Sequence, residues 1–385
     1  MSFAQYMERY DRQECRHLLE STDSSKVRML LTKASLSPAD FLLLLSPAAG
    51  AVLEPMAQKA RLLTIKHFGR NILLYTPLYL SNYCVNHCLY CQFHSGKKIV
   101  REQLSLVEVE AEGKSIAATG IRHLLLLTGE SCAHATTAYL SDCLRILHPC
   151  FASLGLEIYT LSVEEYAQMI QAGAESLTLY QETYQQESYA QLHLSGPKRD
   201  YINRLHAAER ACQAGMRRIN IGALFGLAPW RQEAFWAGLH AYYLQKRYPA
   251  TEIAISLPRV RSSHEGFTVP CPVNDKELVQ ILLAFRLFLP QAGITISTRE
   301  RAELRDNLLP LGVTTMSVGS KTTVGGYFAG EKKGNQQFPV ADERSIGEIK
   351  EIIRRQGYQP VMKDWPTSWN QGNAGERSGW ACQGD

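Results

Sequence analysis

The sequence predicts an α/β protein, a closed (β/α)8 barrel of the TIM type that is preceded by a helical extension. Short apolar runs suited to β-strands alternate with longer segments of helical periodicity, and this alternation repeats eight times between residues 72 and 318. Polar or glycine-rich groups follow several of the strand-like runs. Eight units fit a closed barrel better than an open sheet, and the chemistry of such barrels lies where the strands end. We therefore expect residues 71–365 to form the barrel.

The composition narrows the class of protein. The chain has 385 residues, of which 45% are hydrophobic and 20% charged, so it can bury a large core. Its 41 Lys and Arg and 37 Asp and Glu are spread along the chain without a dense basic run, which argues against a nucleic-acid partner. The N-terminus carries Glu8, Arg9, Asp11 and Arg12 where a signal peptide would need an apolar segment, and the longest apolar stretch, residues 41–57, is interrupted by Pro47 and Pro55. We expect a cytoplasmic protein that does not enter a membrane.

The first 70 residues are expected to form a helical N-terminal extension. Apolar residues such as Tyr6, Tyr10 and Leu18 recur at helical spacing, and Ser37-Pro38 is typical of a helix start.

The barrel elements follow from the same patterns. Helices are expected at residues 106–118, 139–147, 163–172, 201–214, 233–245 and 275–289, and strands at residues 72–80, 123–128, 157–161, 176–181, 218–224, 252–258, 295–298 and 315–318. Beyond Trp365 the chain is rich in Gly, Ser and Asn, so residues 366–385 are expected to be a flexible tail.

Three cysteines stand together directly after the first expected strand. Cys84, Cys88 and Cys91 are spaced by four and three residues, while the other seven cysteines are scattered. Thiolates suit iron–sulfur clusters, which usually take four of them, so three protein ligands would leave one iron of a 4Fe-4S cluster open for substrate or cofactor. The alternative is a zinc site in which His87 or His94 supplies a fourth ligand, in a protein that binds zinc without catalysis.

The cysteine motif is similar to that of a known superfamily. A CxxxCxxC motif with an aromatic residue, Tyr90, before its last cysteine resembles the defining motif of radical S-adenosylmethionine enzymes. The resemblance implies that the open iron binds the methionine part of S-adenosylmethionine, and that one electron from the cluster breaks a C–S bond to give a 5'-deoxyadenosyl radical. Thr128-Gly129-Glu130, after the second strand, is similar to the superfamily's GGE motif, which holds the cofactor's ammonium group. Glu130 could instead stabilise a helix N-terminus.

Further segments narrow the resemblance to the 2-iminoacetate synthase family, the tyrosine lyases of thiazole biosynthesis. The segments are LYQETY at residues 179–184, IGALFGL at 221–227, SLPRVR at 256–261, ISTRE at 296–300 and VMKDW at 361–365. The resemblance implies removal of a hydrogen from L-tyrosine and cleavage of its Cα–Cβ bond, giving 2-iminoacetate and p-cresol for thiamine biosynthesis. It also implies a ThiG-type thiazole synthase partner and a flavodoxin-type reductant.

Arginines are the expected ligands of the substrate carboxylate. Arg299 is the first candidate, because it follows a strand and a guanidinium is a strong clamp for a carboxylate. A structural ion pair with Glu300 is the alternative. Arg259 and Arg261 are further candidates that could equally pair with neighbouring acids.

Four more residues complete the expected site. Glu182 could hold the ribose hydroxyls of the cofactor or form a buried salt bridge. Gly222 could let the backbone approach the adenine or mark a bulge. Together with Arg299, His193 and Glu300 are candidate catalytic residues, since either could take the phenolic proton of tyrosine.

Two other radical functions stay open. One is a lyase that acts on another aromatic compound, such as tryptophan or a deazaflavin precursor. The other is the related tyrosine cleavage that yields carbon monoxide and cyanide for hydrogenase assembly, which uses a second cluster on a Cys-rich C-terminal extension. Here only Cys382 follows Cys271, which favours the thiamine role.

Overall fold

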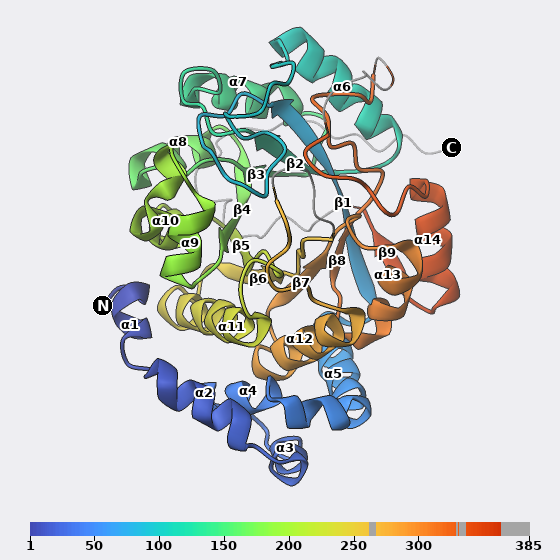
Figure 1. The fold of residues 1–385 in the computed structure, drawn as a ribbon. Coiled ribbons are helices and arrows are strands. Elements are labelled where there is room, and N and C mark those ends of the chain that lie inside the picture. Colours follow the sequence, from blue (N-terminus) through green and yellow to red (C-terminus); the bar gives the residue numbers. More distant parts are fainter. Residues whose placement is uncertain (262–266, 329, 331–335, 363–385) are drawn as a thin grey trace.

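A computed structural model describes residues 1–261, 267–328, 330 and 336–362, and it confirms the expected barrel. The strand order is β2-β3-β4-β5-β6-β7-β8-β1, all neighbours are parallel, and β1 pairs back onto β2, which closes the barrel (Figure 1). The strands are β1 Asn71–Ser81, β2 His123–Thr128, β3 Ser153–Glu157, β4 Ala174–Glu182, β5 Arg218–Ala223, β6 Glu252–Ser256, β7 Gly293–Ile296, β8 Thr315–Ser317 and β9 Gln359–Val361.

Helices surround the barrel and alternate with its strands, as the chain order requires. They are α6 Leu106–Ala118, α7 Thr137–Leu147, α8 Val163–Gln171, α9 Gln186–Leu192, α10 Tyr201–Gln213, α11 Trp230–Arg247, α12 Asp275–Phe288, α13 Ala302–Leu308 and α14 Ile346–Arg355, with short 3-10 turns η2 Pro197–Arg199 and η3 Leu309–Leu311. Capping boxes mark two helix starts: Ser105 and Glu108 form one at α6, and Asn274 and Glu277 form another at α12.

The N-terminal helices form a layer on the outside of the barrel (Figure 1). They are α1 Phe3–Met7, α2 Arg12–Ser21, α3 Ser24–Leu30, α4 Pro38–Leu44 and α5 Leu53–Phe68, with the turn η1 Pro47–Ala51. Ser37 caps α4 as its sequence predicts. Phe41 of α4 stacks on Phe288 with ring centroids 4.4 Å apart, and Gly238 of α11 leaves the space for it, since an added Cβ would lie 2.5 Å from the Phe41 ring. The layer thus shares the core of the barrel.

Two strands differ from the sequence prediction. β3 spans 153–157 rather than 157–161, because its glycine and polar ends give a weak strand pattern, whereas Ile158, Tyr159 and Leu161 are buried in the loop that follows. Gly155 fits β3 because an added Cβ would lie 2.5 Å from Ser176 Oγ in β4. β9 was not expected, since three residues that include Pro360 carry no recognisable pattern; it pairs with the first residues of β1.

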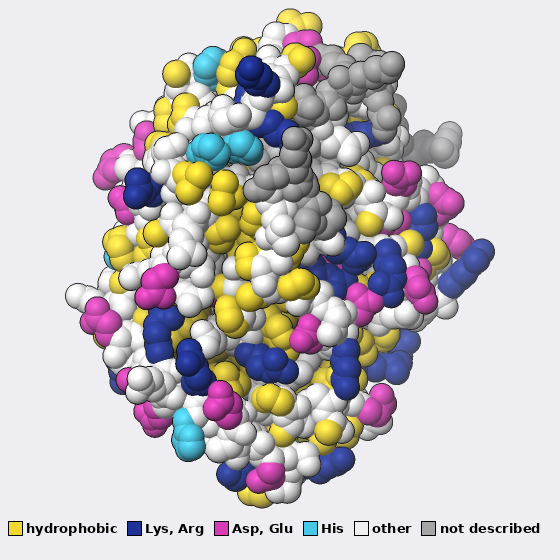
Figure 2. Space-filling view, viewed as in Figure 1, with side chains coloured by type: hydrophobic (Ala, Val, Ile, Leu, Met, Phe, Trp, Pro, Cys, Tyr) yellow, Lys and Arg dark blue, Asp and Glu magenta, His cyan; other side chains and the backbone are white. Residues whose placement is uncertain are grey.

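The surface is mixed in character. Figure 2 shows hydrophobic side chains toward the middle of one face, with basic and acidic side chains interspersed around them. Among the described residues, no helix combines the length and the apolar character that a bilayer crossing requires.

Candidate active site

A cavity of about 450 Å³ lies at the carboxyl ends of the strands. Its lining comes from the carboxyl ends of barrel strands and from the segments that follow them, and residues 336–339, which come after β8, complete it. This is the end of a parallel barrel where catalytic groups gather. Of the residues expected from the sequence, it contains Cys84, Cys88, Cys91, Thr128, Gly129, Glu130, Glu182, Arg259, Arg261 and Arg299.

The three cysteines share one wall of this cavity. None of them forms a disulfide, and burial raises the pKa of the Cys88 thiol to about 12. Iron–sulfur clusters bind thiolates, so a bound cluster would have to supply the positive charge that ionises this thiol. No group of three or more His, Cys, Asp or Glu among the described residues is arranged to hold a single metal ion, and neither His87 nor His94 lines the cavity. Three thiols that line the cavity without a histidine beside them as a fourth ligand suit an iron–sulfur cluster with one open iron better than a closed zinc site.

The loop that carries the three cysteines is hydrogen-bonded to the end of α9 and to the segment between α9 and η2. Backbone hydrogen bonds join Leu89 N to Leu192 O (3.0 Å) and Leu194 N to His87 O (2.9 Å). The amide of Asn86 links the loop to two other elements: its Nδ2 donates to Glu130 Oε2 (2.7 Å), and its Oδ1 accepts from the backbone N of Lys198 (2.9 Å). Hydrogen bonds to Glu130, which follows β2, to the end of α9 and to η2 therefore hold the loop that carries the thiols.

Thr128-Gly129-Glu130 forms the cavity wall beside the cysteines. A Cβ on Gly129 would lie 2.3 Å from the carbonyl oxygen of Tyr83, so only glycine fits against the cysteine loop. The next helix, α7, begins at Thr137 and is capped by Thr136. Glu130 therefore lies outside its first turn, and the alternative role at a helix N-terminus does not apply.

Glu182 forms the buried salt bridge that was one of the two roles considered for it, and it also lines the cavity. It faces the cavity from the end of β4, and it forms ion pairs with Lys198 Nζ (2.7 Å) and Arg204 (3.7 Å). Burial raises the pKa of its carboxyl, but Lys198 and Arg204 outweigh that effect and leave the pKa below its ordinary value. Its backbone φ of 69° is the only left-handed value of a non-glycine residue among the described positions, a strain typical of functional sites.

The arginines divide into one with no acidic partner and two that are paired. Arg299 lies over the ring of Phe338, 3.5 Å from the centroid, and among the described residues no carboxylate is within ion-pair distance of it. Glu300 instead binds Arg259 (2.6 Å) and Arg261 (2.8 Å), so the Arg299–Glu300 pair is not formed. Arg259 is 3% exposed in its side chain and also contacts Asp275. Its charge is thus already satisfied.

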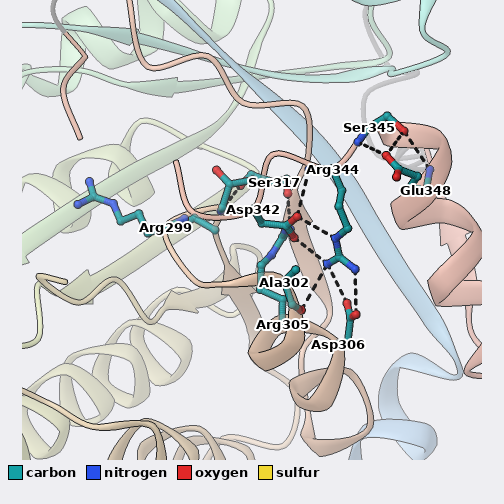
Figure 3. Close-up of polar contacts among 11 residues, drawn as sticks. Arg299, Ala302, Arg305, Asp306, Ser317, Asp342, Arg344, Ser345 and Glu348 are labelled. Carbon is teal, nitrogen blue, oxygen red and sulfur yellow. Dashed lines mark hydrogen bonds and ion pairs between the residues drawn. The ribbon is translucent and has the colours of Figure 1, made fainter. Parts of the chain in front are cut away.

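The segment that carries Phe338 is anchored by a buried ion network (Figure 3). Asp342 lies between Arg305 and Arg344, and Arg344 also binds Asp306 at 2.9 Å. Arg305 and Asp342 have fully buried side chains. Figure 3 shows the Arg299 side chain extending away from this network. In the same segment, Gln337 accepts a hydrogen bond from the Tyr79 hydroxyl (2.7 Å), and its amide nitrogen lies 3.9 Å from Cys91 Sγ.

His193, Gly222 and Glu300 do not line the cavity. His193 is buried; its Nε2 pairs with the Tyr90 hydroxyl (2.8 Å) and its Nδ1 with the Tyr189 carbonyl (2.8 Å), so Tyr90 stands between it and the cavity. A Cβ on Gly222 would lie 2.7 Å from the Ser256 carbonyl oxygen, so close strand packing accounts for this glycine.

Sequence reasoning missed several residues of the cavity wall. Arg204, Gln337 and Phe338 belong to no motif, and Glu157 was treated only as the start of a strand. Glu157 is the last residue of β3. Burial raises the pKa of its carboxyl to about 7, although the charge of Arg299 acts in the opposite direction. A polar residue at the end of a buried strand was the available signal for Glu157.

Comparison with known proteins agrees with this geometry. Residues 78–233 match the Radical SAM superfamily, and residues 256–359 match the Biotin and Thiamin Synthesis associated domain. The chain is 39% identical to 2-iminoacetate synthase of Salmonella typhimurium, over 90% of this chain and 92% of that protein. It is 36% identical to 2-iminoacetate synthase of Escherichia coli, over 94% and 97% of the two chains.

The fold is also similar to a solved structure. The crystal structure of HydG, a maturase of the FeFe-hydrogenase, superposes with a TM-score of 0.87 at 29% identity and covers 95% of this chain and 82% of that chain.

Proposed function

Because the chain belongs to the radical SAM superfamily and, within it, to the 2-iminoacetate synthase family, we propose that it cleaves the Cα–Cβ bond of L-tyrosine to 2-iminoacetate and p-cresol for thiazole formation in thiamine biosynthesis. It is a radical SAM carbon–carbon lyase, and a 4Fe-4S cluster and S-adenosylmethionine are its cofactors. The observation that carries the choice of substrate is an arginine with no acidic partner, Arg299, in the cavity that also contains the three cysteines.

The residues of the cavity fit both cofactors. Cys84, Cys88 and Cys91 would hold the cluster, and Glu130 would accept hydrogen bonds from the ammonium group of S-adenosylmethionine. Lys198 and Arg204 would face its carboxylate, and Glu182 its ribose hydroxyls. When bound, the reduced cluster and S-adenosylmethionine supply the radical that removes a hydrogen atom from the substrate.

The side chains of the cavity would position the substrate. Arg299 would bind the carboxylate of tyrosine, and the face of Phe338 keeps the guanidinium in one plane for a two-point contact. Arg259 and Arg261 would act indirectly: they hold Glu300, which directly follows Arg299 in the chain. His193 would position Tyr90 rather than take up the phenolic proton.

The experiment is an anaerobic reaction of the cluster-loaded protein with a reductant, S-adenosylmethionine and tyrosine. We expect 5'-deoxyadenosine and p-cresol together, measured by chromatography with mass detection, and neither product from a Cys88→Ala variant. Deoxyadenosine without p-cresol would exclude tyrosine as the substrate, and an active Cys88→Ala variant would exclude the cluster assignment.

A second candidate function is favoured by the likeness to HydG. In it the same cleavage of tyrosine would lead to carbon monoxide and cyanide. Measuring cyanide in the reaction above separates the two, because the thiamine role predicts p-cresol without cyanide.

Partners and location are also part of the proposal. We propose a ThiG-type thiazole synthase and a flavodoxin-type reductant as partners, as the resemblance to the 2-iminoacetate synthase family implies. The absence of disulfides among the nine described cysteines supports a cytoplasmic location. Copurification with either partner tests the first point.

A further inference from the structure

Two side chains of opposite charge line the cavity without an ion pair to any described residue. Glu157 ends β3 and Arg299 follows β7. In the closed strand order, β3 and β7 are four steps apart in both directions, so the two residues enter the cavity from opposite sides of the barrel. Among the described residues, neither side chain has a hydrogen bond or an ion pair with an oppositely charged group. Both side chains are partly buried at the cavity, and a ligand that displaced their remaining water would leave each charge costly unless it supplied the opposite charge.

The other acids of the cavity wall already have partners. Three carboxylates line the cavity: those of Glu130, Glu157 and Glu182. Glu182 binds Lys198 and Arg204, and Glu130 accepts from Asn86. Glu157 is therefore the carboxylate that remains for a cationic group of the substrate.

A free amino acid has the complementary charges. It carries a carboxylate and an ammonium group on the same carbon atom. A site that binds it therefore needs a cationic and an anionic side chain that both reach the position of this carbon. The charge of Arg299 reaches Glu157, since it lowers the pKa that burial raises. We infer that Glu157 binds the α-ammonium group of the substrate while Arg299 binds its α-carboxylate; this rests on the proposed function, in which the substrate is tyrosine.

The arrangement sets the specificity of the site. An ammonium group beside Glu157 would replace water on the carboxylate and favour its ionised form. A charge-assisted hydrogen bond would then join the two groups. The aromatic ring of the substrate then extends from this polar end toward Tyr79 and Tyr180, which line the same cavity. Compounds without the amino group should bind weakly, even when they keep the phenol and the carboxylate.

The test uses ligands that each lack one polar group of tyrosine. Cluster-loaded protein with S-adenosylmethionine and no reductant is titrated by calorimetry with L-tyrosine, 3-(4-hydroxyphenyl)propanoate, tyramine and L-phenylalanine. Glu157→Gln should weaken tyrosine and phenylalanine binding about 10- to 100-fold and leave hydroxyphenylpropanoate unchanged, since a hydrogen bond between charged groups is being removed. Arg299→Gln should weaken the binding of hydroxyphenylpropanoate and leave the binding of tyramine, which has no carboxylate, unchanged. Glu110→Gln, an exposed position outside the cavity, is the matched control.

The outcomes separate the failure of this inference from failure of the proposed function. If the wild type binds tyrosine, and Glu157→Gln weakens the binding of hydroxyphenylpropanoate as much as that of tyrosine, Glu157 does not act on the ammonium group. If Glu157→Gln weakens tyrosine but not phenylalanine, Glu157 contacts the phenol instead. A wild type that does not bind tyrosine overturns the proposed function. If Glu157→Gln does not fold, the wild-type affinities alone test the inference, which requires that tyrosine bind the wild type about 10- to 100-fold more tightly than hydroxyphenylpropanoate. Equal affinities would overturn it.

Discussion

Replacing Asp342 with alanine should lower the free energy of unfolding by about 3 to 5 kcal/mol, the range found when one partner of a buried ion pair is removed. Arg305, whose side chain is fully buried, would keep only its hydrogen bond to the Ser317 carbonyl. Arg344 would keep Asp306. The large cost therefore comes from Arg305, a charge left in the interior without a carboxylate.

The matched control is Asp306→Ala, which removes the other acidic partner of Arg344. Asp306 is 23% exposed in its side chain and Arg344 is 18% exposed, and Asp342 continues to bind Arg344, so the loss should stay below about 1 kcal/mol. Urea unfolding followed by circular dichroism gives both values. If the two variants unfold at the same urea concentration, the interior charge is compensated in some other way and the reasoning is wrong.

Three further predictions concern the site and the core. Replacing any one of Cys84, Cys88 and Cys91 with alanine should abolish 5'-deoxyadenosine formation and lower the bound iron. The control is Cys132→Ala, which removes an exposed thiol and should retain both the activity and the iron. An unchanged iron content in the first three variants would contradict the cluster assignment. Phe338→Leu should weaken tyrosine binding by about 10- to 30-fold through loss of the cation–π contact with Arg299 and leave tyramine binding unaltered, as titration calorimetry can show. Burial raises the pKa of Glu233 to about 7 from 4.5, so the native protein binds this proton more tightly than the unfolded chain, and the associated stability is lost as the pH rises through 7. Between about pH 5 and pH 8 the urea midpoint of Glu233→Gln should therefore fall less than that of the wild type. An equal fall of the midpoint in both proteins would refute this.

The barrel could be predicted because its elements carry local patterns. α6 and β2 have the expected bounds, since a capping box marks the start of one and an unbroken apolar run forms the other. β3 was misplaced by four residues because buried loop residues after it imitate a strand. The flexible tail expected at residues 366–385, with Cys382, lies outside the described residues.

Part of the cavity lining could be expected from short motifs and from family-like segments, the latter for Glu182, Arg259, Arg261 and Arg299. The three cysteines and Thr128-Gly129-Glu130 form short motifs, and each meets the cavity as a group. Glu157, Arg204 and Phe338 come singly from three different elements, and only the closed barrel brings them to one cavity. The pairing of Glu300 with Arg259 and Arg261, rather than with its neighbour Arg299, depends on how β6 and β7 approach each other and leaves no trace in the sequence.

The seam of the barrel has a consequence for synthesis on the ribosome. Residues 71–73 of β1 pair with residues 359–361 of β9, and residues 73–75 pair with β8, so the first barrel strand obtains two of its partners only near the end of translation. Until then the growing sheet keeps an unpaired edge on each side, the kind of edge that recruits other chains or chaperones. Nascent chains arrested before residue 315 should therefore be degraded by added protease along their full emerged length, and protection should rise sharply once residue 361 has left the exit tunnel.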